Sequence, residues 1–132
     1  MDAQVNTHGS ESLPQNINSA ILPGKAEKMK EAAVSICDNY LWIRMPRELD
    51  HHTVSGIRKE ADQKLMSSAV EHMVFDFAQT EFMDSSGIGM IVGRYKQADC
   101  LGVSVIVIHM NRRIRKLLQL AGLETMIEFE QE

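Results

Sequence analysis

The sequence has few of the features that mark specialised classes of protein. Its 132 residues include only two cysteines, Cys37 and Cys100, so a scaffold of disulfide bonds is excluded by count. No apolar run approaches the roughly 18 residues that a membrane span requires. The N-terminus has neither a basic region nor an apolar run, so it is not a secretory signal peptide. These absences indicate a protein of the cytoplasm, in which we expect both cysteines to be free and mostly buried thiols.

The charge balance is weakly acidic, with 14 basic and 18 acidic residues and a net charge of −4. This balance excludes a broadly basic protein of the histone type. A local cluster of Arg112, Arg113, Arg115 and Lys116 has no aromatic platform beside it. We therefore interpret it as a solvated helix face and expect no binding of nucleic acid. The length and the 44% of hydrophobic residues are typical of one globular domain.

The chain divides near residue 33. Residues 1–24 contain few apolar residues in no regular period, which predicts a disordered or loosely held leader. Residues 25–33 are good helix formers, and a short helix is one option there, although a helix of this length is marginal in water by itself. We expect residues 34–132 to form the folded domain and the leader 1–33 to be dispensable for its folding.

The rest of the sequence alternates between strand and helix patterns. Apolar alternation and short apolar runs predict strands, and apolar residues spaced by three or four predict helices. The strands are expected over 34–37, 40–45, 72–77, 103–108 and 126–129, and the helices over 53–69, 86–100 and 111–121. Thr53 and Asn111 are candidate N-caps, and Gly102 and Gly122 are placed to end the second and third helices.

This order of elements predicts the fold class. Strands that alternate with single helices favour a mostly parallel sheet with crossover helices, and the first two strands add an antiparallel hairpin at its edge. The predicted class is therefore α/β with a mixed sheet. Ligand and partner sites in such sheets lie at the carboxyl ends of the strands, where loops lead into helices. The loops over 46–53 and 79–86 occupy that place.

The second loop carries the most distinctive residues of the chain. It reads Phe82-Met83-Asp84-Ser85-Ser86-Gly87-Ile88-Gly89. Gly87, Gly89 and Gly93 each lower helix propensity by about 1 kcal/mol, which indicates either close packing of the backbone or an exposed surface that receives another molecule. A dinucleotide fingerprint does not fit, because the third glycine is missing at the required spacing, and the Gly-Lys-Ser/Thr of a P-loop is absent.

A serine in this loop stands at the positive end of a helix dipole. A phosphate added there would meet N–H donors and a favourable field. It would also add about −1.5 to −2 charges, and the neighbouring Asp84 would make the modified surface strongly anionic. The loop therefore predicts a phosphorylation site that changes local charge with little refolding.

Two segments of the chain resemble the STAS domains of bacterial anti-sigma factor antagonists, most closely the sporulation-type antagonists. The segments are Glu48-Leu49-Asp50-His51-His52-Thr53 and the loop at 82–89, which continues through Gly93-Arg94-Tyr95-Lys96. The resemblance covers roughly residues 34–129 and implies a STAS-like fold. In that family the first serine after the aspartate is phosphorylated by an anti-sigma factor that is also a serine kinase. The matching residue here is Ser85.

The resemblance also implies a mechanism without enzymatic activity or a cofactor. The unmodified form binds the anti-sigma factor and frees a sigma factor, the phosphorylated form does not bind, and a serine phosphatase restores the first form. The implied protein is a monomer or weak dimer, and an alternative is a STAS subunit of a larger signalling assembly. The expected partner-binding residues are Asp50, His51, His52, Thr53, Met83, Asp84, Ser86, Gly87 and Ile88.

Two alternative sites do not fit the sequence, and one question about the fold stays open. Adjacent histidines seldom chelate one ion, so Asp50-His51-His52 with His72 and His109 does not predict a metal site. A hydrolase triad built on the loop serine lacks the Gly-x-Ser-x-Gly elbow. Members of the resembled family often have a further helix after the last strand, so either one sheet face is less covered here or an arm from residues 25–33 covers it.

Overall fold

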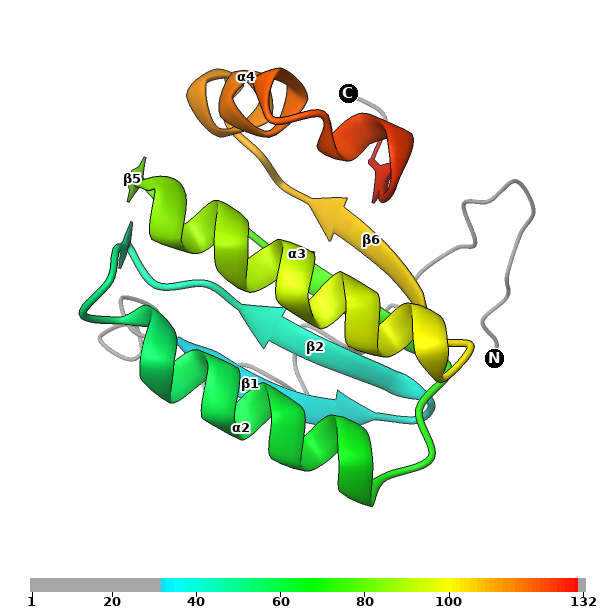
Figure 1. Cartoon of the computed structure of the whole chain (residues 1–132). Helices are drawn as coiled ribbons and strands as arrows, with labels where there is room; N and C mark the ends of the chain where they lie inside the picture. The colour runs from blue at the N-terminus through cyan, green and yellow to red at the C-terminus, as the bar shows by residue number, and fades with distance from the viewer. Residues whose placement is uncertain (1–31, 131–132) are drawn as a thin grey trace.

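The computed structural model describes residues 32–130, which form two sheets and three α-helices (Figure 1). The predicted leader, with its optional helix over 25–33, lies outside the described residues except at its last two positions. Ala33 is already the first residue of strand β1, so the strand begins one residue earlier than predicted.

The main sheet has five strands in the order β1-β2-β4-β6-β7. These strands are β1 (Ala33–Cys37), β2 (Tyr40–Arg44), β4 (His72–Asp76), β6 (Ser104–Ile108) and β7 (Glu128–Phe129). The helices are α2 (Val54–Ser67), α3 (Ser85–Cys100) and α4 (Arg112–Leu120), followed by the 3-10 helix η2 (Leu123–Thr125). A second sheet pairs β3 (Glu48–Leu49) with β5 (Phe82–Met83).

All three helices lie on one face of the main sheet. Strand β1 runs antiparallel to β2, and the other pairs are parallel, which confirms the predicted mixed sheet. From β2 through β4 and β6 to β7 the chain always advances in the same direction across the sheet. Right-handed crossovers then place every connecting helix on the same side. Figure 1 shows α2 and α3 next to each other over this face.

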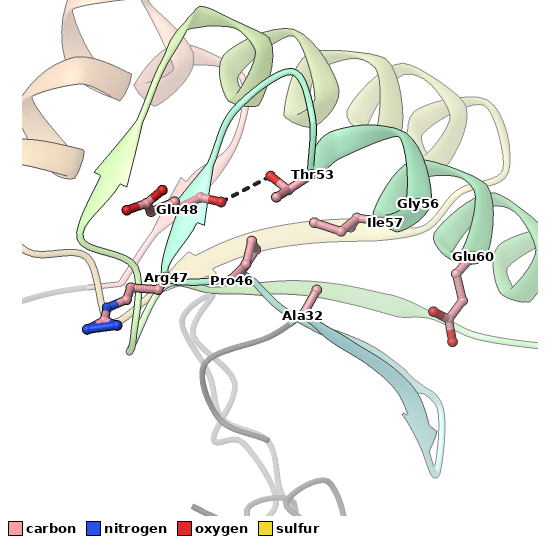
Figure 2. A pocket seen from close by; sticks show the side chains of 8 residues that line it. All are labelled: Ala32, Pro46, Arg47, Glu48, Thr53, Gly56, Ile57 and Glu60. Carbon is pink, nitrogen blue, oxygen red and sulfur yellow. Dashed lines mark hydrogen bonds between the residues drawn. The ribbon is translucent and has the colours of Figure 1, made fainter. Parts of the chain in front are cut away.

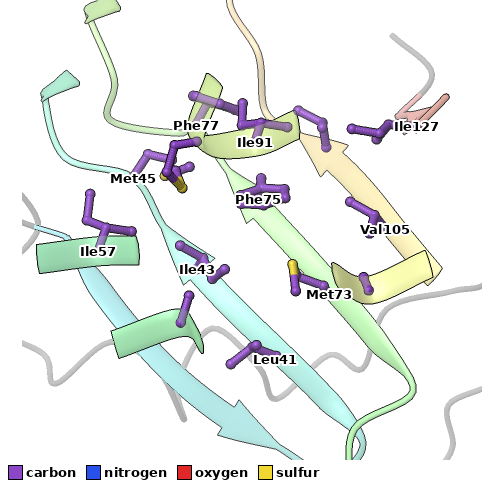
Figure 3. Packing of buried hydrophobic residues seen from close by; sticks show 14 of the residues in the cluster. Leu41, Ile43, Met45, Ile57, Met73, Phe75, Phe77, Ile91, Val105 and Ile127 are labelled. Atoms are coloured by element: carbon purple, nitrogen blue, oxygen red, sulfur yellow. The ribbon is translucent and has the colours of Figure 1, made fainter. Parts of the chain in front are cut away.

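The helix-covered face holds the main hydrophobic core. Leu41 and Ile43 of β2 and Phe75 of β4 are fully buried there, beneath Ile57 of α2 and Ile91 of α3 (Figure 3). Burial of one such side chain stabilises the fold by about 1.5–3 kcal/mol. The core therefore fixes the ends of the strands from which the two predicted loops emerge.

Several predicted helix boundaries are confirmed. The Asn111 side chain accepts a hydrogen bond from the Ile114 N–H at 2.8 Å and caps α4. Gly102 and Gly122 end the second and third helices with φ angles of 74° and 81°, a region that a residue without Cβ adopts without strain. No helix within residues 32–130 is long and apolar enough to cross a membrane.

Other local predictions are confirmed only in part. Thr53 occupies the N-cap position of α2, but its side chain makes no capping bond, because its hydroxyl is engaged by the preceding turn. The last strand covers only 128–129, because η2 takes up the residues just before it. Both cysteines are free, but Cys100 is exposed and Cys37 half-buried.

Candidate functional site

The two predicted loops meet in the small β3–β5 sheet. Leu49 lies opposite Met83 in parallel register, and the Asp84 N–H donates to the Leu49 carbonyl at 3.1 Å. The same register places Asp50, the next residue after β3, beside Asp84. The sheet therefore brings two carboxylates from distant parts of the sequence to one end of the molecule.

Ser85 is the first residue of α3, one position earlier than the predicted start of the helix. The Asp84 carboxylate caps the helix by accepting the Ser86 N–H at 2.8 Å, and the Asp84 carbonyl accepts the Gly87 N–H at 3.0 Å. Ser85 is exposed, whereas Ser86 is half-buried. Of the two serines, Ser85 is therefore the more accessible to another molecule.

Gly87 allows α3 to approach the small sheet closely. A Cβ atom at this position would lie 2.6 Å from Met83 Cγ and 2.9 Å from Leu49 Cδ2. At Gly89 and Gly93 the same atom would meet nothing within 4 Å. Close packing thus accounts for Gly87 alone, and the other two glycines leave room on the helix surface.

The Asp50 turn is held by reciprocal hydrogen bonds. Asp50 Oδ1 accepts from the backbone N–H groups of His52 and Thr53 at 2.9 and 3.1 Å. Thr53 Oγ1 accepts from the Asp50 N–H at 3.0 Å and donates to the Glu48 carbonyl at 3.0 Å. Desolvation acts to raise the pKa of the Asp50 carboxyl, but these N–H donors and the two adjacent histidines outweigh it, so the pKa is lowered. The carboxylate is therefore ionised near neutral pH.

A groove of about 560 Å³ opens beside β3 (Figure 2). Its wall combines apolar and charged side chains of the first loop and α2 with Ala32, the residue before β1. The lining residues are Ala32, Pro46, Arg47, Glu48, Thr53, Gly56, Ile57 and Glu60. A groove of this kind, bordered by the first of the two predicted loops, can receive side chains of a partner protein.

Comparison with known proteins decides the family. The family model described as the STAS domain matches residues 31–132.

The chain belongs to the STAS domain family.

Relatives of this STAS domain have regulatory names. An anti-sigma F factor antagonist of Paenibacillus polymyxa is 39% identical over 83 residues, which are 63% of this chain and 71% of the relative. The solved structure of the anti-sigma factor antagonist SpoIIAA in its unphosphorylated form matches with a TM-score of 0.68 and 28% identity, over 76% of this chain and 89% of that one. The Bacillus cell fate determinant SpoIIAA in its phosphorylated form matches with a TM-score of 0.63 and 28% identity, over 76% and 92%.

The Gly93-Arg94-Tyr95-Lys96 part of the STAS motif has a structural role. Arg94 is only 8% exposed, and its Nε lies 2.9 Å from Asp62 Oδ1 of helix α2. This ion pair joins α3 to α2 through a buried guanidinium and a partly exposed carboxylate.

The histidines of this STAS domain do not gather at one place. His51 and His52 are exposed neighbours with ring centroids 4.0 Å apart. His72 stacks on Tyr40, and His109 bonds to a carboxylate at the end of β4. Among residues 32–130, no group of three or more His, Cys, Asp or Glu side chains could hold a metal ion.

The predicted partner residues divide by accessibility. Met83 and Gly87 are buried, so they position the loops, whereas His51 and His52 are exposed. Sequence reasoning did not select Phe82, which is 48% exposed on β5 three residues before Ser85. The sequence signal for Phe82 is an aromatic residue within the motif, but its exposure depends on the pairing of β5 with β3.

Proposed function

We propose that this chain is an anti-sigma factor antagonist controlled by phosphorylation of Ser85. The observation that carries the proposal is the place of this serine. It is the exposed first residue of α3, at the end of the small sheet that also brings Asp50 and Asp84 together. The family's regulatory names agree with a role in protein binding.

In the unmodified form, the site presents a neutral hydroxyl to an anti-sigma factor with serine kinase activity. The exposed part of the binding surface consists of His51, His52 and Phe82, with the half-buried side chains of Ser86 and Ile88 next to Ser85. Apolar and aromatic groups at its centre would provide most of the binding free energy. Binding of the kinase would free the sigma factor.

Phosphorylation transfers the γ-phosphoryl group of ATP to Ser85 Oγ and releases ADP. The product carries about −1.5 to −2 charges at neutral pH. Asp84 and Asp50 already lie at this end of the molecule, so the modified surface repels any partner face shaped for a neutral serine. A serine phosphatase would return the site to its binding form by hydrolysis.

The test is to locate the phosphate. The chain is incubated with the anti-sigma kinase of the same organism and ATP, and the modified peptide is mapped by fragmentation. We expect phosphate on Ser85 alone, full incorporation in Ser86→Ala and none in Ser85→Ala. Phosphate on Ser86 alone, or on neither serine, would contradict the proposal.

A further inference from the structure

Helix α4 carries an excess of positive charge. Its sequence is Arg-Arg-Ile-Arg-Lys-Leu-Leu-Gln-Leu, with no acidic residue, in a chain whose net charge is −4. Arg115 has a role within the fold, because its Nη2 donates to the Glu130 carbonyl at 2.6 Å and its guanidinium lies 5.6 Å from the centroid of the Phe129 ring. The other cations of the helix are exposed, and these are Arg112, Arg113 and Lys116.

The exposed cations form one face of α4 together with an apolar side chain. Arg112, Lys116 and Leu120 are four residues apart, which places them on one line along the helix, and Arg113 lies beside this line. Leu120 is 76% exposed, whereas the apolar side chains on the opposite side of α4 are buried in the core. Figure 1 shows α4 at the edge of the molecule, next to η2. We call Arg112, Arg113, Lys116 and Leu120 the basic face.

The charges of the basic face do not stabilise the helix that carries them. Arg112 and Arg113 stand in the first turn, where the positive end of the helix dipole repels cations. Lys116 follows them by four and three residues, so each pair adds repulsion between like charges. Within residues 32–130, none of the three cations makes an ion pair. The arrangement lowers the stability of the free chain, and carboxylates of another molecule would offset this loss.

The basic face begins at the same end of the sheet as Ser85. Strand β6 runs parallel to β4, so α4 starts at the carboxyl ends of the strands, as do the two predicted loops. The start of α4 is bonded to the second loop, since Asn111 Nδ2 donates to the Thr80 carbonyl at 3.2 Å. A typical protein interface buries about 800 Å² on each partner. A protein bound at Ser85 can therefore extend across this loop to Arg112 and Arg113.

The chemistry of the basic face fits an acidic protein segment, whose carboxylates would pair with the cations while an apolar side chain covers Leu120. Nucleic acid fits less well, because the chain is acidic overall and the face has no aromatic side chain for a base to stack on. A membrane surface fits less well, because the apolar side of α4 is buried in the core.

We propose that the basic face of α4 is a second docking surface for the anti-sigma factor, which binds it through an acidic segment. This inference rests on the proposed function and adds to it a contact outside the Ser85 site. The contact would hold the partner through charge, so its contribution to affinity should decrease as salt screens the exposed cations.

Charge reversal on the basic face separates docking from folding. The double variant Arg112→Glu, Arg113→Glu places acidic residues in the first turn of α4, so its thermal stability should stay the same or rise. Its affinity for the anti-sigma kinase of the same organism, measured by titration calorimetry at low salt, should fall about tenfold or more and depend less on salt than that of the wild type. Lys116→Glu should lower the affinity several-fold. Lys96→Glu, at an exposed lysine of α3, is its matched control and should bind like the wild type.

The variant Ser85→Asp in the same titration keeps this proposal distinct from the proposed function. Wild-type affinity in the basic-face variants, with binding lost in Ser85→Asp, would overturn the docking surface and leave the proposed function intact. Weak binding of the basic-face variants, with Ser85→Asp unaffected, would support the docking surface and contradict the switch. A wild-type chain that does not bind the kinase would contradict both. Binding of a DNA duplex or of phosphatidylserine vesicles that charge reversal abolishes would assign the face to another kind of partner and overturn the proposal. If the double variant does not fold, Lys116→Glu decides.

Discussion

Helices α2 and α3 begin next to each other at the same end of the sheet, each after one strand of the β3–β5 pair, yet their hydroxyl groups differ in access. At the start of α2, Thr53 Oγ1 is bound to the backbone of Glu48 and Asp50. At the start of α3, Ser85 is exposed, and among the described residues its hydroxyl has no bonded partner. The helix is instead capped by Asp84.

This difference separates Ser85, the proposed phosphorylation site, from Thr53, although both residues carry a hydroxyl group. Both positions place a hydroxyl at the positive end of a helix and beside a carboxylate, so the local field is similar. A phosphoryl acceptor must also leave its backbone contacts and enter the cleft of a kinase. Thr53 would have to give up the bonds that form its turn, whereas Ser85 would give up none.

The largest expected effect follows from adding charge at the accessible hydroxyl. Ser85→Asp should weaken binding of the anti-sigma factor by about 2–5 kcal/mol, tens- to thousands-fold, with the lower end favoured because aspartate carries less charge than phosphate. Ser85→Ala should bind like the wild type and accept no phosphate. Titration calorimetry measures both, and equal affinities for the three proteins would contradict the electrostatic account.

A second change tests the packing that holds the start of α3. Gly87→Ala places a methyl group against Met83 and Leu49, so we expect a loss of about 1–3 kcal/mol in the free energy of unfolding and slower phosphorylation. Gly89→Ala is the matched control in open space and should gain up to about 1 kcal/mol. Urea unfolding compares the two, and equal stabilities would show that the close approach does not matter.

A third change removes the bound hydroxyl at the start of α2. Thr53→Val keeps the shape of the side chain but loses its bonds to Glu48 and Asp50, which should lower stability by about 0.5–1.5 kcal/mol. Phosphate incorporation at Ser85 should remain near the wild-type rate. Thermal unfolding and incorporation are measured on the same preparation. Normal stability with poor incorporation would instead make Thr53 part of the kinase contact.

The smallest expected effect concerns Asp50 and pH. Its folded pKa is below the ordinary value of 3.8, so its contribution to stability is present above that value and is lost as the pH falls through the folded pKa. The amide oxygen of asparagine can accept the same two N–H bonds, so Asp50→Asn should fold with almost normal stability at pH 7 and lack this acid dependence. Unfolding curves between pH 7 and 3 check this, and parallel acid profiles for the two proteins would argue against it. Impaired phosphorylation of the variant would place Asp50 in the partner surface.

The sequence alone predicted the helices and strands whose apolar residues recur at a regular spacing. The alternation of Leu41 and Ile43 predicted the buried face of β2, and the glycine at 122 predicted the end of α4. The small sheet was not predicted, because two residues per strand give no period. The buried pair of Arg44 and Asp76 was also missed, because its partners come from different strands and are paired only by the register of the sheet.

The site was predictable only where its residues leave a local pattern in the sequence. The motif placed Ser85 correctly at a helix start, because capping residues leave a local pattern. The motif did not show which of its residues are buried and which are exposed. In the structure Met83 faces the core, whereas its neighbour Phe82 faces solvent. That distinction depends on the pairing of β5 with β3, which connects residues far apart in the chain.

The small size of the β3–β5 sheet has a consequence for motion. It is separate from the five-stranded sheet and is joined by few backbone bonds, among them those from the N–H groups of Phe82 to Arg47 and of Asp84 to Leu49. Local opening free energy falls with the number of such bonds and the apolar area they protect. The amide hydrogens of Phe82 and Asp84 should therefore exchange with solvent much faster than those in the middle of β4. The serine end of the molecule can then change shape when another protein binds there, while the core remains folded.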